Sequence, residues 1–238
     1  MIQILIDEKK DRKNGYVNCC HVIVDDHGIK QKKIITTETL CELFEKSTKR
    51  EKKEISIGKV PRGYLATKYQ IQDYPKLKSK TAIFLKEDIR RIIYKNSVYE
   101  IPIPNLLMIH SVIENGCVST QLFCLEKNMN LDKVGMLLEK NTLPKLYLWP
   151  FANVDKEFGK VCYGSNAIRK IEKLSDLDIL PILFFDSPMN DDYYGKSRTV
   201  LEKSKLHELL DFLNGQKEFP YEILKEYCPS EHTKKDLF

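Results

Sequence analysis

One segment, residues 146–164, constrains the fold and the chemistry of this chain more than any other. It begins with an apolar, β-prone run that ends at Pro150, and Asn153 then opens a polar loop. Gly159 turns this loop shortly before Cys162. The pattern predicts a strand that leads into irregular backbone, where a thiol lies beside an amide side chain and free backbone N–H groups. Acyl transfer through a thioester needs these groups, because a thiolate carries the acyl group and a hydrogen-bond donor stabilises the oxyanion.

The order of the predicted elements indicates an α+β fold built on an antiparallel sheet, because strands come first and helices last. Apolar runs predict strands at residues 1–6, 16–24, 54–57, 98–103, 106–113, 118–125, 145–148 and 182–185. Periodicity and capping signals predict helices at residues 36–46, 132–139, 166–174 and 197–214. Residues 82–94 fit a strand or a helix, and periodicity does not decide between the two.

A change in composition indicates where the chain divides. Its 238 residues suit one large domain or two small ones. The change lies near residues 75–97. It predicts an N-terminal α+β region at residues 1–95, a core at 96–225 and a C-terminal tail at 226–238. One continuous domain is the alternative, since no linker-like stretch marks the boundary.

Composition and charge argue against several classes of protein. No apolar run approaches the roughly 18–20 residues that cross a membrane, and the N-terminus lacks the features of a secretory signal. We therefore expect a cytoplasmic protein with no membrane partner. The net charge of +5 is mild, and acidic residues or prolines interrupt the lysine clusters, so nucleic-acid binding is not expected. Tyrosines lie among the basic residues between positions 62 and 78, so nucleic-acid binding is kept as an alternative.

The seven cysteines are irregularly spaced and form no CxxC pair, so neither a metal site nor a disulfide framework is predicted. Cys41 and Cys124 lie in apolar runs and are predicted to be buried, because a free cysteine packs as a small hydrophobe. Cys162 lies among glycine, lysine and tyrosine. It is therefore the predicted reactive cysteine, and the alternative is a surface cysteine without a function.

The segment around Cys162 resembles the active site of ubiquitin-conjugating enzymes. Pro150-Phe-Ala-Asn-Val154, a short loop and Gly159-Lys-Val-Cys-Tyr-Gly164 stand where that family has His-Pro-Asn before its acyl-carrying cysteine. The chain is most similar to the prokaryotic family D of this superfamily, which includes the PRTRC system protein B. Phe184-Phe-Asp-Ser187 resembles the Phe-Phe-x-Ser motif of family D. The resemblance runs from about residue 55 to 195.

The resemblance implies a UBC-like fold, in which helices flank an antiparallel sheet, here with an N-terminal α+β extension. It also implies an enzyme that carries a ubiquitin-like protein as a thioester and transfers it to an amine. The implied partners are that ubiquitin-like protein, a ThiF-like activating enzyme and, at the level of the family, a JAB-type deconjugating peptidase. No soluble cofactor is implied, because the activating enzyme would use the nucleotide.

Seven residues are candidates for the site. The predicted catalytic residues are Cys162 as the acyl carrier, Asn153 as the oxyanion donor and Asp191 as the acceptor of the amine proton. The predicted substrate-binding residues are Tyr163, Gly164, Asp186 and Tyr193. The simpler alternatives are that Asn153 closes its own turn and that the aspartates, with Asp192, belong to a solvated turn.

Two departures from the family pattern leave a second function open. Trp149-Pro150-Phe151 stands in place of the histidine of His-Pro-Asn. Asn190-Asp191-Asp192 stands where family members carry a histidine after Phe-Phe-x-Ser. The alternative is therefore a non-catalytic adaptor that keeps the fold in order to bind a ubiquitin-like protein or an activating enzyme.

Overall fold

The computed structural model describes residues 2–7, 19–26, 29–36, 39–42, 59–73, 76–113, 116–166, 168–229 and 237–238. The chain divides into two compact units, Met1–Ser56 and Ile57–Phe238. This division differs from the predicted boundary between residues 95 and 96, which falls within the second unit. That position is the turn between strands β6 (Asp88–Tyr94) and β7 (Ser97–Ile103), which pair with each other.

The first unit contains a three-stranded antiparallel sheet in the order β1-β2-β3. Its strands are β1 (Ile2–Asp7), β2 (Cys19–Asp26) and β3 (Ile29–Thr36). The strands predicted at residues 1–6 and 16–24 are thus confirmed where the structure describes them. Residues 39–42 are helical, which covers part of the helix predicted at 36–46. The strand predicted at 54–57 lies outside the described residues.

The second unit is built on a four-stranded antiparallel sheet in the order β4-β5-β8-β9. Its strands are β4 (Tyr64–Asp73), β5 (Lys76–Leu85), β8 (Leu106–Val112) and β9 (Val118–Cys124). The prediction of an α+β fold with an antiparallel sheet is therefore confirmed. The sequence left residues 82–94 open, and the structure places residues 82–85 in β5 and residues 88–94 in β6.

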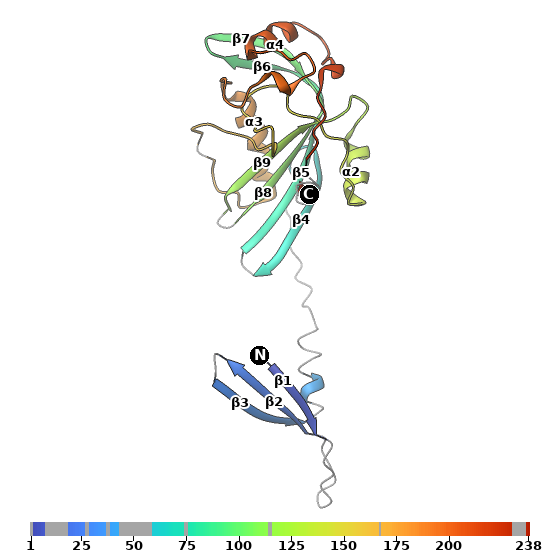
Figure 1. The fold of residues 1–238 in the computed structure, drawn as a ribbon, viewed down its shortest axis with the longest axis vertical. Coiled ribbons are helices and arrows are strands. Elements are labelled where there is room, and N and C mark those ends of the chain that lie inside the picture. Colours follow the sequence, from blue (N-terminus) through green and yellow to red (C-terminus); the bar gives the residue numbers. More distant parts are fainter. Residues whose placement is uncertain are drawn as a thin grey trace, which may run out of the picture. The chain divides into compact units, whose positions relative to one another are not determined.

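Apolar clusters cover both faces of this sheet, because alternate side chains of a strand point to opposite faces. Leu106 and Met108 of β8 join a cluster with α3 (Ile179–Asp186). Leu107 and Ile109 join a second cluster with α2 (Leu131–Glu139). Figure 1 shows α2 and α3 on opposite sides of the sheet, with the β6–β7 hairpin and α4 (Leu206–Leu213) at one end of it.

Four predicted elements differ from the structure. The strand predicted at 182–185 belongs to helix α3, because a continuous apolar run carries no periodicity that separates the two states. Pro181 fits the first turn of α3, whose N–H groups have no partner within the helix. Of the helix predicted at 166–174, residues 166 and 168–173 are not helical, and Leu174 begins the short 3-10 helix η2 (Leu174–Asp178). At 145–148 only Tyr147 forms bridges, to Cys124 and Glu226.

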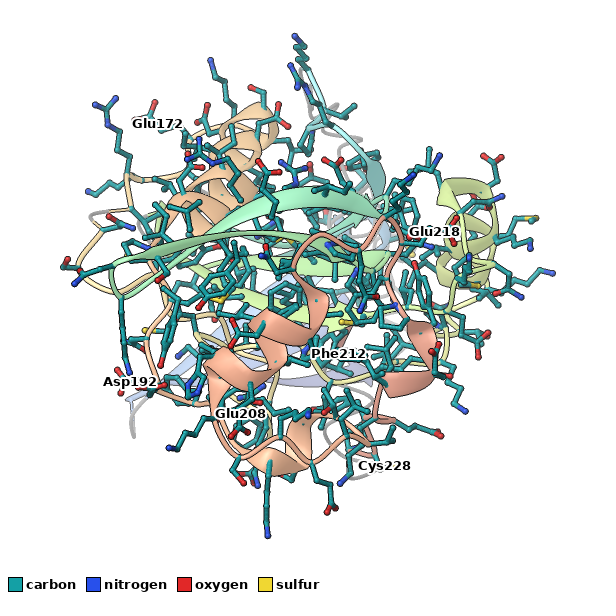
Figure 2. All side chains as sticks on the ribbon, turned by 90° about the horizontal axis from the view of Figure 1, so that it is seen from above. Glu172, Asp192, Glu208, Phe212, Glu218 and Cys228 are labelled. Atoms are coloured by element: carbon teal, nitrogen blue, oxygen red, sulfur yellow. The ribbon has the colours of Figure 1, made fainter. Side chains whose placement is uncertain are left out.

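The helix predicted at 197–214 is reduced to α4 by a tertiary contact. Lys196–Arg198 form one short 3-10 turn, η3. Thr199 then pairs with Leu224 in an antiparallel bridge, and the Val200 N–H donates to the Ile223 carbonyl. This pairing holds the backbone between η3 and α4 away from a helical conformation. On α4 itself, buried leucines face the core, while Figure 2 shows Phe212 and Glu208 on this helix at the front of the view.

Candidate functional site

Cys162 ends an irregular hairpin that lies against the edge of the four-stranded sheet. Val154 and Val161 form an antiparallel bridge, and the Cys162 N–H donates to the Asn153 carbonyl at 2.8 Å. The Val161 N–H donates to the carbonyl of Thr120 on β9, also at 2.8 Å. These backbone bonds fix the cysteine next to the sheet, and its side chain is exposed.

The loop of this hairpin needs both its aspartate and its glycine. Oδ1 of Asp155 accepts hydrogen bonds from the N–H groups of Glu157 and Phe158, at 3.0 and 2.8 Å. Gly159 has φ +67°, and a Cβ at this position would lie 2.5 Å from the ring of Phe123. Any other residue would therefore meet both backbone strain and a clash. The prediction that Gly159 turns the loop is confirmed.

Cys162 borders a cavity of about 180 Å³. Five of the seven predicted site residues line it: Cys162, Asn153, Tyr163, Gly164 and Tyr193. Further lining residues come from the segment after α3, among them Ser187, Asn190 and Asp192. The structure thus brings together two segments that are about thirty residues apart in the chain and that the sequence marked separately.

Asp191 and Asp186 do not line this cavity. The Tyr94 hydroxyl donates to Oδ1 of Asp191 at 2.7 Å, and Nζ of Lys95 lies 3.2 Å from Oδ2. The hydrogen bond from Tyr94, together with Lys95, lowers the pKa of Asp191. Asp186 is exposed at the end of α3. Asp191 is therefore bound to the β6–β7 turn rather than placed beside the thiol.

The neighbouring residue, Asp192, is the acidic residue that lines the cavity. Nδ2 of Asn190 donates to its Oδ2 at 2.9 Å, and the Asp192 N–H donates to Oδ1 of Asn190 at 2.8 Å. The Asp192 carbonyl accepts a hydrogen bond from the Asn153 N–H at 3.4 Å. Figure 2 shows Asp192 at the rim of the second unit, on the other side from Cys228.

Asn153 braces the cavity. Its Nδ2 donates to the Pro188 carbonyl at 3.2 Å, and its side chain is buried. Its φ of +62° is a conformation that asparagine tolerates better than most residues. These contacts support the bracing alternative for Asn153. An amide group carries two N–H donors, so one remains available to an oxyanion.

Tyr163 lines the cavity and also anchors the cysteine to the sheet. Its hydroxyl donates to Oγ1 of Thr120 at 2.9 Å, and the same oxygen is 2.9 Å from Nδ1 of His110. Burial raises the pKa of Tyr163 to about 12. The side chain that follows Cys162 is thus bound into the interior, which directs the thiol outward.

A turn, not a helix, follows Tyr163. The Asn166 N–H donates to the Tyr163 carbonyl at 3.3 Å, and Gly164 has φ +62°. The helix predicted to begin at Asn166 is therefore absent from this side of the cavity. Nδ2 of Asn166 instead donates to Oγ of Ser187 at 2.7 Å, which joins the two sides of the cavity. The N–H groups of Gly164 and Ser165 have no acceptor among the residues that the structure describes.

Arg198 is a site residue that sequence reasoning missed. Its side chain is only 2% exposed, and it donates to the carbonyls of Trp149, Val154 and Tyr193. Burial lowers its pKa to about 10, which leaves the guanidinium charged at neutral pH. An arginine within a predicted helix carries no signal of this role, because its partners are backbone atoms of distant segments.

The other cysteines provide a contrast. Cys124 is fully buried, as predicted, and burial raises its thiol pKa. The prediction for Cys41 is wrong, because that side chain is exposed and Leu40 takes the more protected position on the helix. Cys117 and Cys228 are also exposed. Neither lines the cavity that Cys162 borders, so both serve as internal controls for its reactivity.

Comparisons of the chain with models of protein families, with curated proteins and with solved structures gave no match. In the described part of the chain, no group of His, Cys, Asp and Glu side chains is arranged to hold a metal ion. Likewise, no described helix has the length and apolar character needed to cross a bilayer. What the chain does is therefore inferred from its own residues.

Proposed function

We propose that this chain is a bacterial ubiquitin-conjugating-enzyme-like protein. It carries a ubiquitin-like protein as a thioester on Cys162 and transfers it to an amine. The proposal includes a UBC-type fold for the second unit, with its four-stranded antiparallel sheet followed by the cysteine hairpin. The proposed partners are the ubiquitin-like protein, a ThiF-like activating enzyme and a JAB-type peptidase that reverses the conjugation.

The observation that carries the proposal is the convergence of unusual backbone on one exposed thiol. Asn153, Gly164 and Tyr193 each have φ +62°, and all three line the cavity at Cys162. For the asparagine and the tyrosine this conformation costs of the order of 1 kcal/mol or more. Surrounding structure holds such strain most often where it shapes a functional site.

In the first step, the Cys162 thiolate attacks the carbonyl carbon of the ubiquitin-like C-terminus on the activating enzyme. A carbon–sulfur bond forms to Cys162, and the thiolate of the activating enzyme leaves as the intermediate collapses. The negative charge on the carbonyl oxygen in this intermediate needs hydrogen-bond donors. The unpartnered N–H groups of Gly164 and Ser165 and the second amide hydrogen of Asn153 are the candidates among the described residues.

In the second step, an amine of the acceptor attacks the same carbon, an amide bond forms and Cys162 leaves as the thiolate. The attacking nitrogen loses a proton, which a carboxylate beside the thioester accepts. Asp192 replaces Asp191 as the proposed carboxylate for this step, because Asp192 lines the cavity and Asp191 is bound to Tyr94 and Lys95. A carboxylate at this position also attracts and orients a protonated lysine before it reacts.

The experiment combines the chain with a candidate ubiquitin-like protein, its ThiF-like activating enzyme and ATP. We expect an adduct that thiols cleave in the wild type, none in Cys162→Ala, and a thiol-resistant oxyester in Cys162→Ser. Cys117→Ser and Cys228→Ser are the matched controls and should retain the adduct. An adduct that survives in Cys162→Ala would contradict the proposal.

The adaptor remains the second candidate, and one observation favours it. Among the residues that the structure describes, no histidine lines the cavity. Trp149 is buried, and its Nε1 donates to the Ala152 carbonyl at 3.0 Å. Trp149 thus packs and offers no proton-transfer group. An adaptor would bind the ubiquitin-like protein or the activating enzyme equally well with Cys162 or alanine at this position, and no adduct would form.

A further inference from the structure

The geometry points to Arg198 as the positioning residue that fixes the two walls of the Cys162 cavity relative to each other. This inference deepens the proposed function and rests on it. One wall is the segment that contains Asn153, and the other is the segment that contains Asp192 and Tyr193. Arg198 donates to carbonyls of both: to Trp149 and Val154 in the first and to Tyr193 in the second.

The guanidinium group suits this task. It is planar and has five N–H donors in a rigid fork, whereas a lysine ammonium is a compact charge that cannot span separate acceptors in one plane. No carboxylate lies within salt-bridge distance of Arg198 among the residues that the structure describes. Its bonded partners are therefore backbone carbonyls, and its effect is to hold backbone in place.

The carbonyls that Arg198 binds belong to the strained part of the site. Tyr193 has φ +62°, and its carbonyl oxygen accepts a hydrogen bond from Nε of Arg198. Asn153, with the same φ, directly precedes Val154, whose carbonyl accepts from Nη2. Without the guanidinium, Tyr193 loses a bond at its own carbonyl and Asn153 loses one at the next residue, and both bonds oppose relaxation of the strained backbone. The wall-to-wall bond from the Asn153 N–H to the Asp192 carbonyl, 3.4 Å long, would then weaken.

A second cavity makes this role testable. Arg198 also lines a space of about 240 Å³, which shares Tyr193 with the Cys162 cavity. Shortening the side chain to alanine would extend this space to the position of the guanidinium group. A free guanidinium ion can then enter this space and replace the lost side-chain group. Urea has nearly the same shape but no charge, so it serves as the control.

The first measurement distinguishes the intrinsic reactivity of the Cys162 thiol from the effect of the groups around it. Transfer of an acetylglycine thioester of mercaptoethanesulfonate to Cys162 requires oxyanion donors, and mercaptoethanesulfonate leaves as the thiolate. Alkylation by iodoacetamide displaces iodide and forms no oxyanion. Mass spectrometry of the Cys162 peptide gives both rates. Their ratio measures how well the surroundings of the thiol stabilise the acyl-transfer intermediate, independently of its nucleophilicity.

We expect Arg198→Ala to lower this ratio about tenfold or more, since displacement of reacting groups by about 1 Å can cost up to a hundredfold in rate. Guanidinium chloride, far below the molar concentrations that denature proteins, should restore the ratio, and urea at the same concentration should not. Arg198→Lys, which keeps the charge, is the second variant if the alanine variant fails to fold, and it should also lower the ratio.

Asn105→Ala is the matched control. Asn105 is also buried, and its Nδ2 donates to three backbone carbonyls, those of Glu126, Lys127 and Met129. It braces a turn that does not line the cavity, so its loss should leave the ratio unchanged. An Arg198 variant that folds and keeps the wild-type ratio, or rescue by urea as well as by guanidinium, would overturn the inference.

Hydrogen exchange keeps this inference separate from the proposed function. In Arg198→Ala the amides of residues 149–154 and 190–195 should exchange faster, and guanidinium should slow both segments together. If wild-type Cys162 shows no higher ratio than Cys117 and Cys228, the proposed function fails. In that case, amide exchange that changes together in the two segments still supports the positioning role of Arg198. Exchange that changes in one segment without the other overturns it.

Discussion

The four-stranded sheet and the Cys162 segment belong to the same compact unit, but different interactions stabilise them. Continuous backbone ladders join β4, β5, β8 and β9, and apolar clusters cover both faces. The cavity walls contain little regular structure. Arg198 and Asn153 donate to backbone carbonyls of these walls, and Asn166 donates to the hydroxyl of Ser187.

Because of this difference, substitutions in the sheet and in the cavity walls should affect different properties, the stability of the fold and the reactivity of the site. Apolar burial in the sheet is distributed over many side chains, so the loss of one weakens the fold without changing the geometry at the thiol. The cavity walls depend on a few directional bonds, so the loss of one changes the geometry at little cost to the core. The predictions below test this separation, from the largest expected effect to the smallest.

Met108→Ala should give the largest loss of stability. Met108 is fully buried on the central strand β8. Truncation of such a residue removes apolar contacts and leaves a cavity, which costs about 3 kcal/mol of unfolding free energy. Urea unfolding measures this loss. The ratio of acyl transfer to alkylation at Cys162 should stay at the wild-type value; a parallel fall would show that the sheet and the site are not separable.

A pH-dependent loss of stability should come from the sheet. His110 is fully buried on β8, and its Nε2 has no hydrogen-bond partner among the described residues. Burial lowers its pKa from 6.5 to about 3. Between these values the unfolded chain binds a proton that the folded protein does not. Stability therefore rises with pH in this window and is lost as pH falls, by about 2 kcal/mol from pH 7 to pH 5.

Urea unfolding at the two pH values measures this effect. His110→Asn should lose most of the difference between pH 7 and pH 5, whatever its stability at pH 7. His207→Gln, on α4, should retain it. An unchanged pH dependence in His110→Asn would show that other groups cause the acid sensitivity.

The two neighbouring aspartates should differ in their effect on acyl transfer. Asp192→Asn removes the carboxylate from the cavity, so aminolysis of the Cys162 thioester by free lysine should slow about tenfold, a barrier increase of about 1.4 kcal/mol. Asp191→Asn is the matched control, because that carboxylate binds Tyr94. Single-turnover decay of the thioester gives both rates. A larger loss of rate in Asp191→Asn than in Asp192→Asn would show that Asp191, not Asp192, is the carboxylate that acts in this step.

Gly164→Ala should have the smallest effect on stability. The φ of Gly164 is +62°, and an added Cβ would have no neighbour within 4 Å. The cost is therefore backbone strain alone, about 1 kcal/mol in unfolding free energy. Chemical denaturation would detect it. A loss as large as that of Met108→Ala would mean that this turn contributes to the core of the fold.

Local signals predicted the sheet and part of the site. The runs that became β7, β8 and β9 are bounded by prolines or a hairpin signal, and no distant contact overrides them. Cys162, Asn153 and Tyr193 were found because a glycine-bounded loop and a turn-rich segment stand out locally. The structure places all three at one cavity.

What the sequence did not predict depends on distant contacts. Arg198 acts through carbonyls that lie up to 49 residues away, and carbonyls carry no sequence signal. The choice between Asp191 and Asp192 depends on Tyr94, 97 residues before Asp191 in the chain. The domain boundary near residue 95 differs from the division after Ser56 because a change in composition does not reveal which strands share a sheet.

The most direct test of the account is a site-resolved measurement of acyl transfer on the wild-type protein. The chain is exposed to the acetylglycine thioester, and the acylated fraction of each cysteine peptide is followed by mass spectrometry against its alkylation by iodoacetamide. We predict that Cys162 acquires the acyl group faster, relative to alkylation, than the exposed Cys117 and Cys228. Equal ratios at the three cysteines would contradict a site built to carry a thioester.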